Sequence, residues 1–123
     1  MSNILKDKVA LVTGSGRGIG KAIAQTFAAE GAAVIVATRT AEYGQQTVDS
    51  IRAAGGNAHL IATELGSPAE SARVVDFTLK TCGALDVMVH NAALPVPMPV
   101  EELTEDVLDR TLALNCKAAV WLT

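Results

Sequence analysis

The chain has 123 residues, of which half are apolar and 19% are charged, and its formal net charge is −3. This length allows one small domain, and the high apolar content is typical of a globular chain and excludes a disordered one. The sequence contains no basic block, which argues against nucleic acid or an anionic membrane as a partner.

Metal-binding and targeting signals are missing from the sequence. The start of the chain has no apolar leader segment, and no later stretch is long and apolar enough to span a bilayer. Cys82 and Cys116 share no metal-ligand or redox spacing, so we expect reduced thiols in a cytoplasmic protein. His59 and His90 lie far apart without other ligand residues around them, so we expect no metal site.

Short apolar runs alternate with segments of helical length. The runs predict strands at residues 9–12, 34–37, 59–62 and 86–90, each followed by a helix. Repeated strand–helix units of this length favour right-handed crossovers and a parallel sheet. The sequence therefore predicts an α/β fold with a Rossmann-like doubly wound parallel sheet, of which strands one to four and their helices are present.

Capping residues locate the predicted helices. The first covers residues 17–30, and Thr40 is placed to cap a second that ends at Gly55-Gly56. The third begins at Ser67, which is followed by proline at the first helical position and glutamate at the third. Thr104 opens a fourth helix that continues to the end of the chain. One apolar face of the first helix is predicted to comprise Ile19, Ala22, Ile23 and Phe27.

The stretch TGSGRGIG, residues 13–20, directly follows the first strand and indicates a phosphate-binding loop. A Walker loop is excluded because Ser15 replaces its first glycine and Ala22 replaces its metal-binding hydroxyl. The dinucleotide-binding spacing G-x-G-x-x-G does not match this stretch either. The pattern Thr13-Gly14-x-x-x-Gly18-Ile19-Gly20 resembles the cofactor loop of the short-chain dehydrogenase/reductase family, in which backbone and a helix N-terminus bind the cofactor pyrophosphate.

The resemblance extends along the chain. Residues 85–93, LDVMVHNAA, resemble the strand-four signature of the family at Asn91 and Ala92, and depart from it at His90 and Ala93. Glu64-Leu65 stands where the family has an aspartate and an apolar residue beside the adenine. The cofactor-binding residues indicated by the resemblance and the loop are Gly14, Ser15, Arg17, Gly18, Ile19, Gly20, Thr38, Arg39, Glu64, Leu65, Asn91 and Ala92.

Asn115 matches the helix asparagine of the family's Asn-Ser-Tyr-Lys tetrad. Helical spacing places it on one face with Leu108, Leu112 and Leu122, so we expect a buried amide that must find partners. One alternative is a structural hydrogen bond to backbone. The resemblance implies instead a catalytic role, in which Asn115 holds a water in a proton relay.

The cofactor is predicted to be NADP(H) rather than NAD(H). The second strand ends at Thr38, where an NAD enzyme places a carboxylate to bind the ribose 2′-hydroxyl. Arg39 follows, and its guanidinium can bind a 2′-phosphate through charge-assisted hydrogen bonds. Arg17 in the glycine loop adds a second cation. The alternative for Arg39 is a solvated side chain that precedes a helix.

The remaining tetrad residues have no counterpart in the sequence. The single tyrosine, Tyr43, lies in the second helix, and Thr47 stands where the lysine of Tyr-x-x-x-Lys would be. We therefore expect residues 1–123 to be the N-terminal, cofactor-binding half of a larger enzyme, without its C-terminal catalytic half. Alone, this chain is predicted to be inactive.

The resemblance implies an oxidoreductase that moves hydride between a nicotinamide and a small carbonyl compound or secondary alcohol, similar overall to the 3-oxoacyl-carrier-protein reductases. It also implies a homodimer or homotetramer for the intact protein, with an interface that includes the last helix. The alternative is a non-catalytic module that binds a dinucleotide for regulation. A serine and a Tyr-x-x-x-Lys motif further along the natural reading frame would favour the enzyme.

Overall fold

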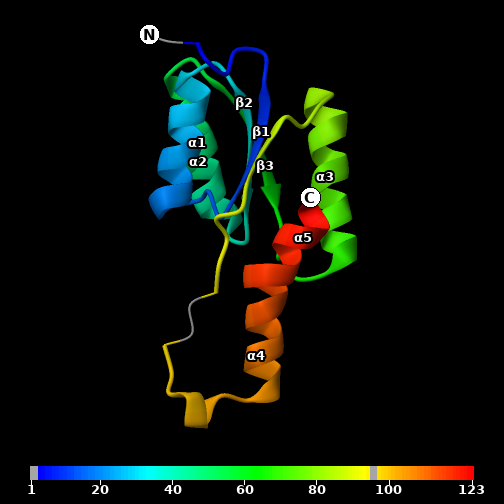
Figure 1. Cartoon of the computed structure of the whole chain (residues 1–123). Coiled ribbons are helices and arrows are strands. Elements are labelled where there is room, and N and C mark those ends of the chain that lie inside the picture. Colours follow the sequence, from blue (N-terminus) through cyan, green and yellow to red (C-terminus); the bar gives the residue numbers. More distant parts are fainter. Residues whose placement is uncertain (1–2, 95–96) are drawn as a thin grey trace.

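The computed structural model describes residues 3–94 and 97–123. Its strands form one parallel sheet in the order β3-β2-β1-β4, as the strand–helix alternation predicts (Figure 1). The predicted Rossmann-like α/β fold is thus confirmed. The strands are β1 (Val9–Thr13), β2 (Ala33–Thr38), β3 (Asn57–Ala62) and β4 (Val87–Val89).

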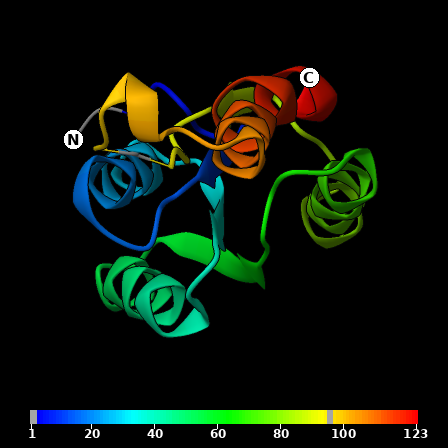
Figure 2. The ribbon, with the colours of Figure 1, turned by 90° about the horizontal axis from the view of Figure 1, so that it is seen from below.

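Helices cover both faces of the sheet. Helices α1 and α2 pack on one face, and α3 and α5 lie on the other, whereas α4 extends beyond the carboxyl ends of the strands (Figures 1 and 2). A single 3₁₀ turn, Val100–Glu102, precedes α4, and a π-helical segment, Ala113–Lys117, joins α4 to α5. The helices are α1 (Gly18–Ala29), α2 (Ala41–Ala53), α3 (Pro68–Cys82), α4 (Glu105–Leu112) and α5 (Ala118–Leu122).

The hydrophobic core lies on both sides of the two central strands. Every residue of β1 is buried, as are the four central residues of β2, because both faces of these strands are covered by helices. Strand β4 is shorter than the predicted run 86–90 and only half-buried, since it forms one edge of the sheet. In the described part of the chain, one side of β4 therefore has no neighbouring strand.

The predicted apolar face of α1 is confirmed in part, because Ile23 and Phe27 pack against the core whereas Ile19 and Ala22 do not. The side facing the sheet carries Gly20, Ala24 and Ala28, whereas Ile19 is 75% exposed and Ala22 is also exposed. The reason is the close approach of Gly20 to the carbonyl of Gly14, where a Cβ would clash. This contact rotates α1 so that its small residues face the sheet.

Helix caps form at Ser67 and Thr104 as predicted. The Ser67 hydroxyl accepts a hydrogen bond from the Glu70 amide at 3.2 Å, and the Thr104 hydroxyl accepts one from the Val107 amide at 3.2 Å. Thr40 occupies the N-cap position of α2, but its side chain makes no capping hydrogen bond. Thr40 therefore stands at the predicted N-cap position without capping the helix through its side chain.

The last helix is not continuous, which corrects two expectations. The π-helical segment adds residues to one turn, so the residues before and after it do not share the predicted face. Leu112 is 44% exposed, whereas Leu122, which helical spacing places on the same face, is only 4% exposed. Asn115, predicted to be buried, lies in the π-helical segment and is exposed.

Membrane-spanning helices and metal-ligand clusters are both absent from residues 3–94 and 97–123. No helix in them has the length and apolar character needed to cross a membrane. No group of three or more histidine, cysteine or acidic residues in the same ranges is arranged to hold a metal ion. The predicted proline loop at 94–100 includes residues 95–96, which lie outside the described residues; residues 97–99 have no regular structure.

Candidate functional site

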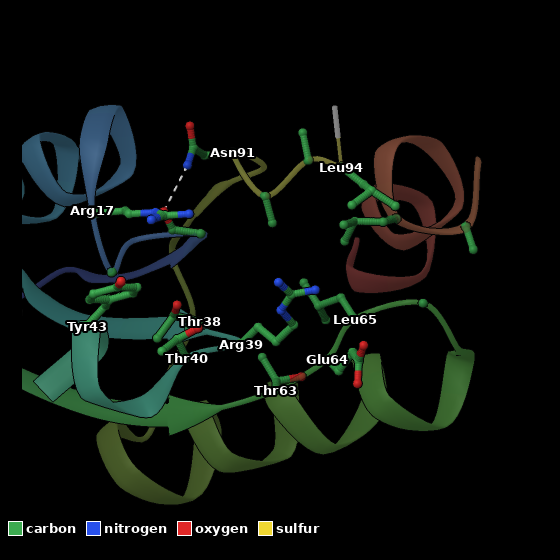
Figure 3. Close-up of a pocket in the computed structure, with 18 of the residues that line it drawn as sticks. Arg17, Thr38, Arg39, Thr40, Tyr43, Thr63, Glu64, Leu65, Asn91 and Leu94 are labelled. Carbon is green, nitrogen blue, oxygen red and sulfur yellow. Dashed lines mark hydrogen bonds between the residues drawn. The ribbon is translucent and has the colours of Figure 1, made fainter. Parts of the chain in front are cut away.

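A cleft of about 540 Å³ lies where the four strands end. Its walls come from the glycine loop after β1, the β2–α2 and β3–α3 connections, the segment after β4, and the junction of α4 with the π-helical segment (Figure 3). Ligands of parallel α/β folds bind at this end of the sheet. The predicted residues that line the cleft are Gly14, Arg17, Thr38, Arg39, Glu64, Leu65, Asn91 and Ala92.

The glycine loop is shaped by close contacts that only glycine permits. Gly14 has φ 66°, and its amide donates a hydrogen bond to the Ala37 carbonyl at 2.8 Å. At Gly16 a Cβ would lie 2.9 Å from both Thr38 Oγ1 and Tyr43 Cβ. The loop therefore lies directly against β2 and α2, and its backbone forms one wall of the cleft.

Two polar side chains connect the ends of β1 and β4. The Thr13 hydroxyl accepts hydrogen bonds from the amides of Asn91 and Ala92, both at 3.0 Å. The Asn91 side chain donates to the Gly14 carbonyl at 3.1 Å (Figure 3). The Asn91 amide group thus holds the first glycine of the loop in place, while the residue also lines the cleft.

Helix α2 anchors the middle of the loop. The fully buried Thr47 hydroxyl donates to the Ser15 carbonyl at 2.9 Å and lies 3.3 Å from the Gly16 carbonyl. The Ser15 side chain is also fully buried, and its hydroxyl donates to the Val12 carbonyl at 2.7 Å. Ser15 therefore shapes the loop from below and does not present its hydroxyl to the cleft.

Two arginines give the cleft a cationic side. Arg17 and Arg39 both line it and are exposed. Within residues 3–94 and 97–123, neither guanidinium has a hydrogen-bond or ion-pair partner; the Arg17 Cζ atom lies over the Tyr43 ring, 5.1 Å from its centroid. Donors held without a protein acceptor in a cleft are suited to an anionic ligand.

The opposite wall follows β3. Thr63 donates a hydrogen bond to Glu70 Oε1 at 2.8 Å, and Arg73 donates to the Ala62 carbonyl at 2.7 Å and to Glu70 Oε1. The hydrogen bonds from Arg73 and from Thr63 hold the pKa of Glu70 below its ordinary value. This network ties the start of α3 to the end of β3, next to Glu64 and Leu65 in the cleft wall.

Asn115 contacts the segment after β4. Its Oδ1 accepts a hydrogen bond from the Leu94 amide at 2.7 Å, and its Nδ2 donates to the Leu94 carbonyl at 3.2 Å. Asn115 also lines a cavity of about 40 Å³ beside the main cleft, together with Thr13 and His90. The geometry matches the structural alternative, a side-chain bond to backbone, in a π-helical segment of the kind often found at functional sites.

Several predicted residues lie outside the cleft lining. Gly18, Ile19 and Gly20 form the first turn of α1, where Arg17 at the N-cap makes no side-chain cap, so their backbone N–H groups have no side-chain acceptor. Gly16, Tyr43 and Thr63 also line the cleft and were missed, although Gly16 lies within the glycine loop and the other two follow predicted strand ends. Nothing in the sequence pattern indicated the remaining lining residues, namely Ala37, Thr40, Gly66, Ala93, Leu94, Arg110, Ala113 and Leu114.

The known sequences that resemble this chain include oxidoreductases. It is 39% identical over 116 residues to an uncharacterized oxidoreductase of Thermotoga maritima, a match that covers 94% of this chain and 45% of the relative. It is 41% identical over 119 residues to a hydroxynaphthalene reductase-like protein of Metarhizium robertsii, with 96% and 45% covered. The chain therefore spans less than half the length of these curated relatives.

Solved structures share the fold closely. A short chain dehydrogenase from Burkholderia cenocepacia in complex with NADP matches with a TM-score of 0.93 and 38% identity, over 98% of this chain and 49% of the other. A metagenomic short-chain oxidoreductase in complex with NADP matches with a TM-score of 0.91 and 34% identity, over 96% and 54%. The family model described as short chain dehydrogenase matches residues 8–123. The chain belongs to the short-chain dehydrogenase family.

Proposed function

We propose that the chain is the cofactor-binding part of an NADP(H)-dependent oxidoreductase acting on a small carbonyl compound or secondary alcohol. One observation carries the choice of cofactor: Arg17 and Arg39 line the cleft beside Thr38, the neutral residue that ends β2. A carboxylate at that end would repel a 2′-phosphate, whereas two guanidinium groups attract it. The NADP bound in the two similar structures supports the proposal.

The glycine loop fits a dinucleotide as well. A Cβ at Gly16 would meet Thr38 and Tyr43, and one at Gly20 would meet the Gly14 carbonyl, so the loop backbone packs closely here without side chains at these positions. The uncapped first turn of α1 provides N–H groups and a positive helix end for a pyrophosphate. Glu64 and Leu65 on the opposite wall are proposed to flank the adenine.

When bound, the nicotinamide supplies the hydride donor or acceptor. The residues of this chain bind and orient it: Asn91 holds the loop at Gly14, and the arginines hold the phosphate. We also propose that Asn115 holds a water in a proton relay. Its bonds to Leu94 leave one N–H on Nδ2 and one lone pair on Oδ1, which are enough to hold a water.

Proton transfer needs a group that the described cleft does not supply. Tyr43 is the single tyrosine of the sequence, and its ring packs beneath Arg17 in the proposed phosphate-binding part of the cleft. Positioned proton transfer contributes roughly 10²–10⁴-fold to a rate. We therefore expect the 123-residue chain to bind nucleotide without measurable turnover of any alcohol or ketone.

The cofactor assignment is tested by titrating the chain with NADPH and with NADH. We expect tighter binding of NADPH, and Arg39→Ala should weaken NADPH by roughly 10–100-fold while leaving NADH little changed, because charge-assisted hydrogen bonds are lost with one ligand only. A wild-type preference for NADH, or equal losses for both cofactors, would contradict the assignment.

A further inference from the structure

Tyr43 supports the Arg17 side chain from below. The Arg17 Cζ atom lies 5.1 Å from the centroid of the Tyr43 ring, within the range of an attractive cation–π contact. Figure 3 shows the guanidinium above the ring, with both residues at the same side of the cleft as Thr38. The Tyr43 side chain is 37% exposed, so its ring face is available to a neighbour without being buried in the core.

The same helix holds the backbone that carries Arg17. One turn after Tyr43, the Thr47 hydroxyl binds the Ser15 carbonyl at 2.9 Å and lies 3.3 Å from the Gly16 carbonyl. Gly16 in turn lies so close to α2 that a Cβ added at this position would be 2.9 Å from Tyr43 Cβ. Helix α2 therefore positions both the backbone that precedes Arg17 and the Arg17 side chain.

Stacking leaves the donors of Arg17 available. A guanidinium that lies over a ring uses its face, whereas its N–H groups point outward in the plane. Within the described ranges Arg17 has no hydrogen bond or ion pair that would occupy these groups. A long side chain loses rotamer freedom when it binds a ligand, and a side chain already held over a ring loses less of it.

We propose that Tyr43 is a specificity-determining positioning residue, whose ring holds Arg17 ready for the 2′-phosphate of NADP(H); this inference rests on the proposed function. Thr38 Oγ1 and Tyr43 Cβ both approach Gly16, so the ring lies beside the strand end that meets the ribose 2′-position in this fold. A ligand without the 2′-phosphate offers Arg17 no partner there. The ring therefore acts on NADP(H) and not on NAD(H).

The test uses 2′,5′-ADP and 5′-AMP, which differ only by the 2′-phosphate, in calorimetric titrations of the whole chain. Tyr43→Leu should weaken the binding of 2′,5′-ADP by about 2- to 5-fold and leave the affinity for 5′-AMP unchanged. Tyr43→Phe keeps the ring and should retain wild-type affinity for both. Lys80→Met, which removes a positive charge from α3 outside the cleft lining, is the matched charge control and should change neither affinity.

A double-mutant cycle separates this role from general packing. In an Arg17→Met background, Tyr43→Leu should have no further effect on 2′,5′-ADP, because the ring acts through the guanidinium. A loss that persists in that background, equal losses for both nucleotides, or a Tyr43→Phe variant as weak as Tyr43→Leu would overturn the inference. If the wild-type chain does not prefer 2′,5′-ADP over 5′-AMP, the proposed cofactor fails and the inference fails with it. If that preference is present and Tyr43→Leu leaves the ratio of the two affinities unchanged, the inference alone fails.

Discussion

Asn115 makes both of its side-chain hydrogen bonds to one residue, Leu94. The Leu94 amide donates to Oδ1 at 2.7 Å, and Nδ2 donates to the Leu94 carbonyl at 3.2 Å. This pair joins the π-helical segment to the chain just after β4, and both segments contribute residues to the cleft lining. The side chain of an exposed asparagine thus ties together two cleft walls that are separated along the sequence.

Replacing Asn115 should loosen this connection. Asn115→Ala removes both bonds, so we expect the free energy of unfolding to fall by about 1 kcal/mol and the Leu94 amide to exchange its hydrogen faster. Asn115→Asp keeps an acceptor for that amide and should protect it partially. Exchange at Leu94 as slow in Asn115→Ala as in the wild type would contradict the described pairing.

Removing the Thr47 hydroxyl should affect both cofactors. Thr47→Val leaves the Ser15 carbonyl without its side-chain donor in a buried site, and such a loss costs about 1–3 kcal/mol of stability. The loosened loop should bind NADPH and NADH more weakly by similar factors, as measured by urea unfolding and nucleotide titration. Thr47→Ser restores the hydroxyl and should recover most of the stability and most of the affinity for both nucleotides. A loss confined to NADPH would contradict a role in holding the loop backbone.

Glu70 should make stability depend on acid pH. The hydrogen bonds from Arg73 and Thr63 lower its pKa in the folded state, so the stabilisation is present above the ordinary value near 4.5. It is lost as the pH falls through the lower, folded-state pKa. Thermal melts should show wild type more stable than Glu70→Gln at neutral pH, with the difference shrinking in acid and at high salt. The exposed Glu101, replaced by glutamine, serves as the control. A difference that does not vary with pH would rule out this origin.

Self-association should involve α4 and the open edge of β4. Leu108 is 46% exposed and Leu112 is 44% exposed on α4, and β4 forms one edge of the sheet. We expect a second copy of the isolated chain to cover this surface; the homodimer or homotetramer that the resemblance implies concerns the intact protein. Sedimentation velocity should show concentration-dependent dimerisation that Leu112→Glu weakens. Ile4→Glu changes an exposed apolar residue that precedes β1 and should leave the dimerisation unchanged. A monodisperse wild-type monomer would contradict this prediction.

Local chemistry in the sequence determined much of this protein. Runs of apolar residues predict the four strands, because a strand covered on both faces needs apolar side chains at successive positions. The Ser67 cap follows from residues within one turn. The glycine spacing after β1 predicts the family and the cleft, since Gly14 and Gly18 take positive φ values that glycine adopts without strain.

Only the tertiary structure decided which faces and partners are used. Helical periodicity places Ile19 with Ile23 and Phe27, but the close approach of Gly20 to Gly14 turns α1 and leaves Ile19 exposed. The π-helical segment changes the phase of the last helix, so Asn115 faces Leu94 while Leu122 enters the core. Both outcomes depend on contacts between separate elements, which a repeat of 3.6 residues within one helix does not encode.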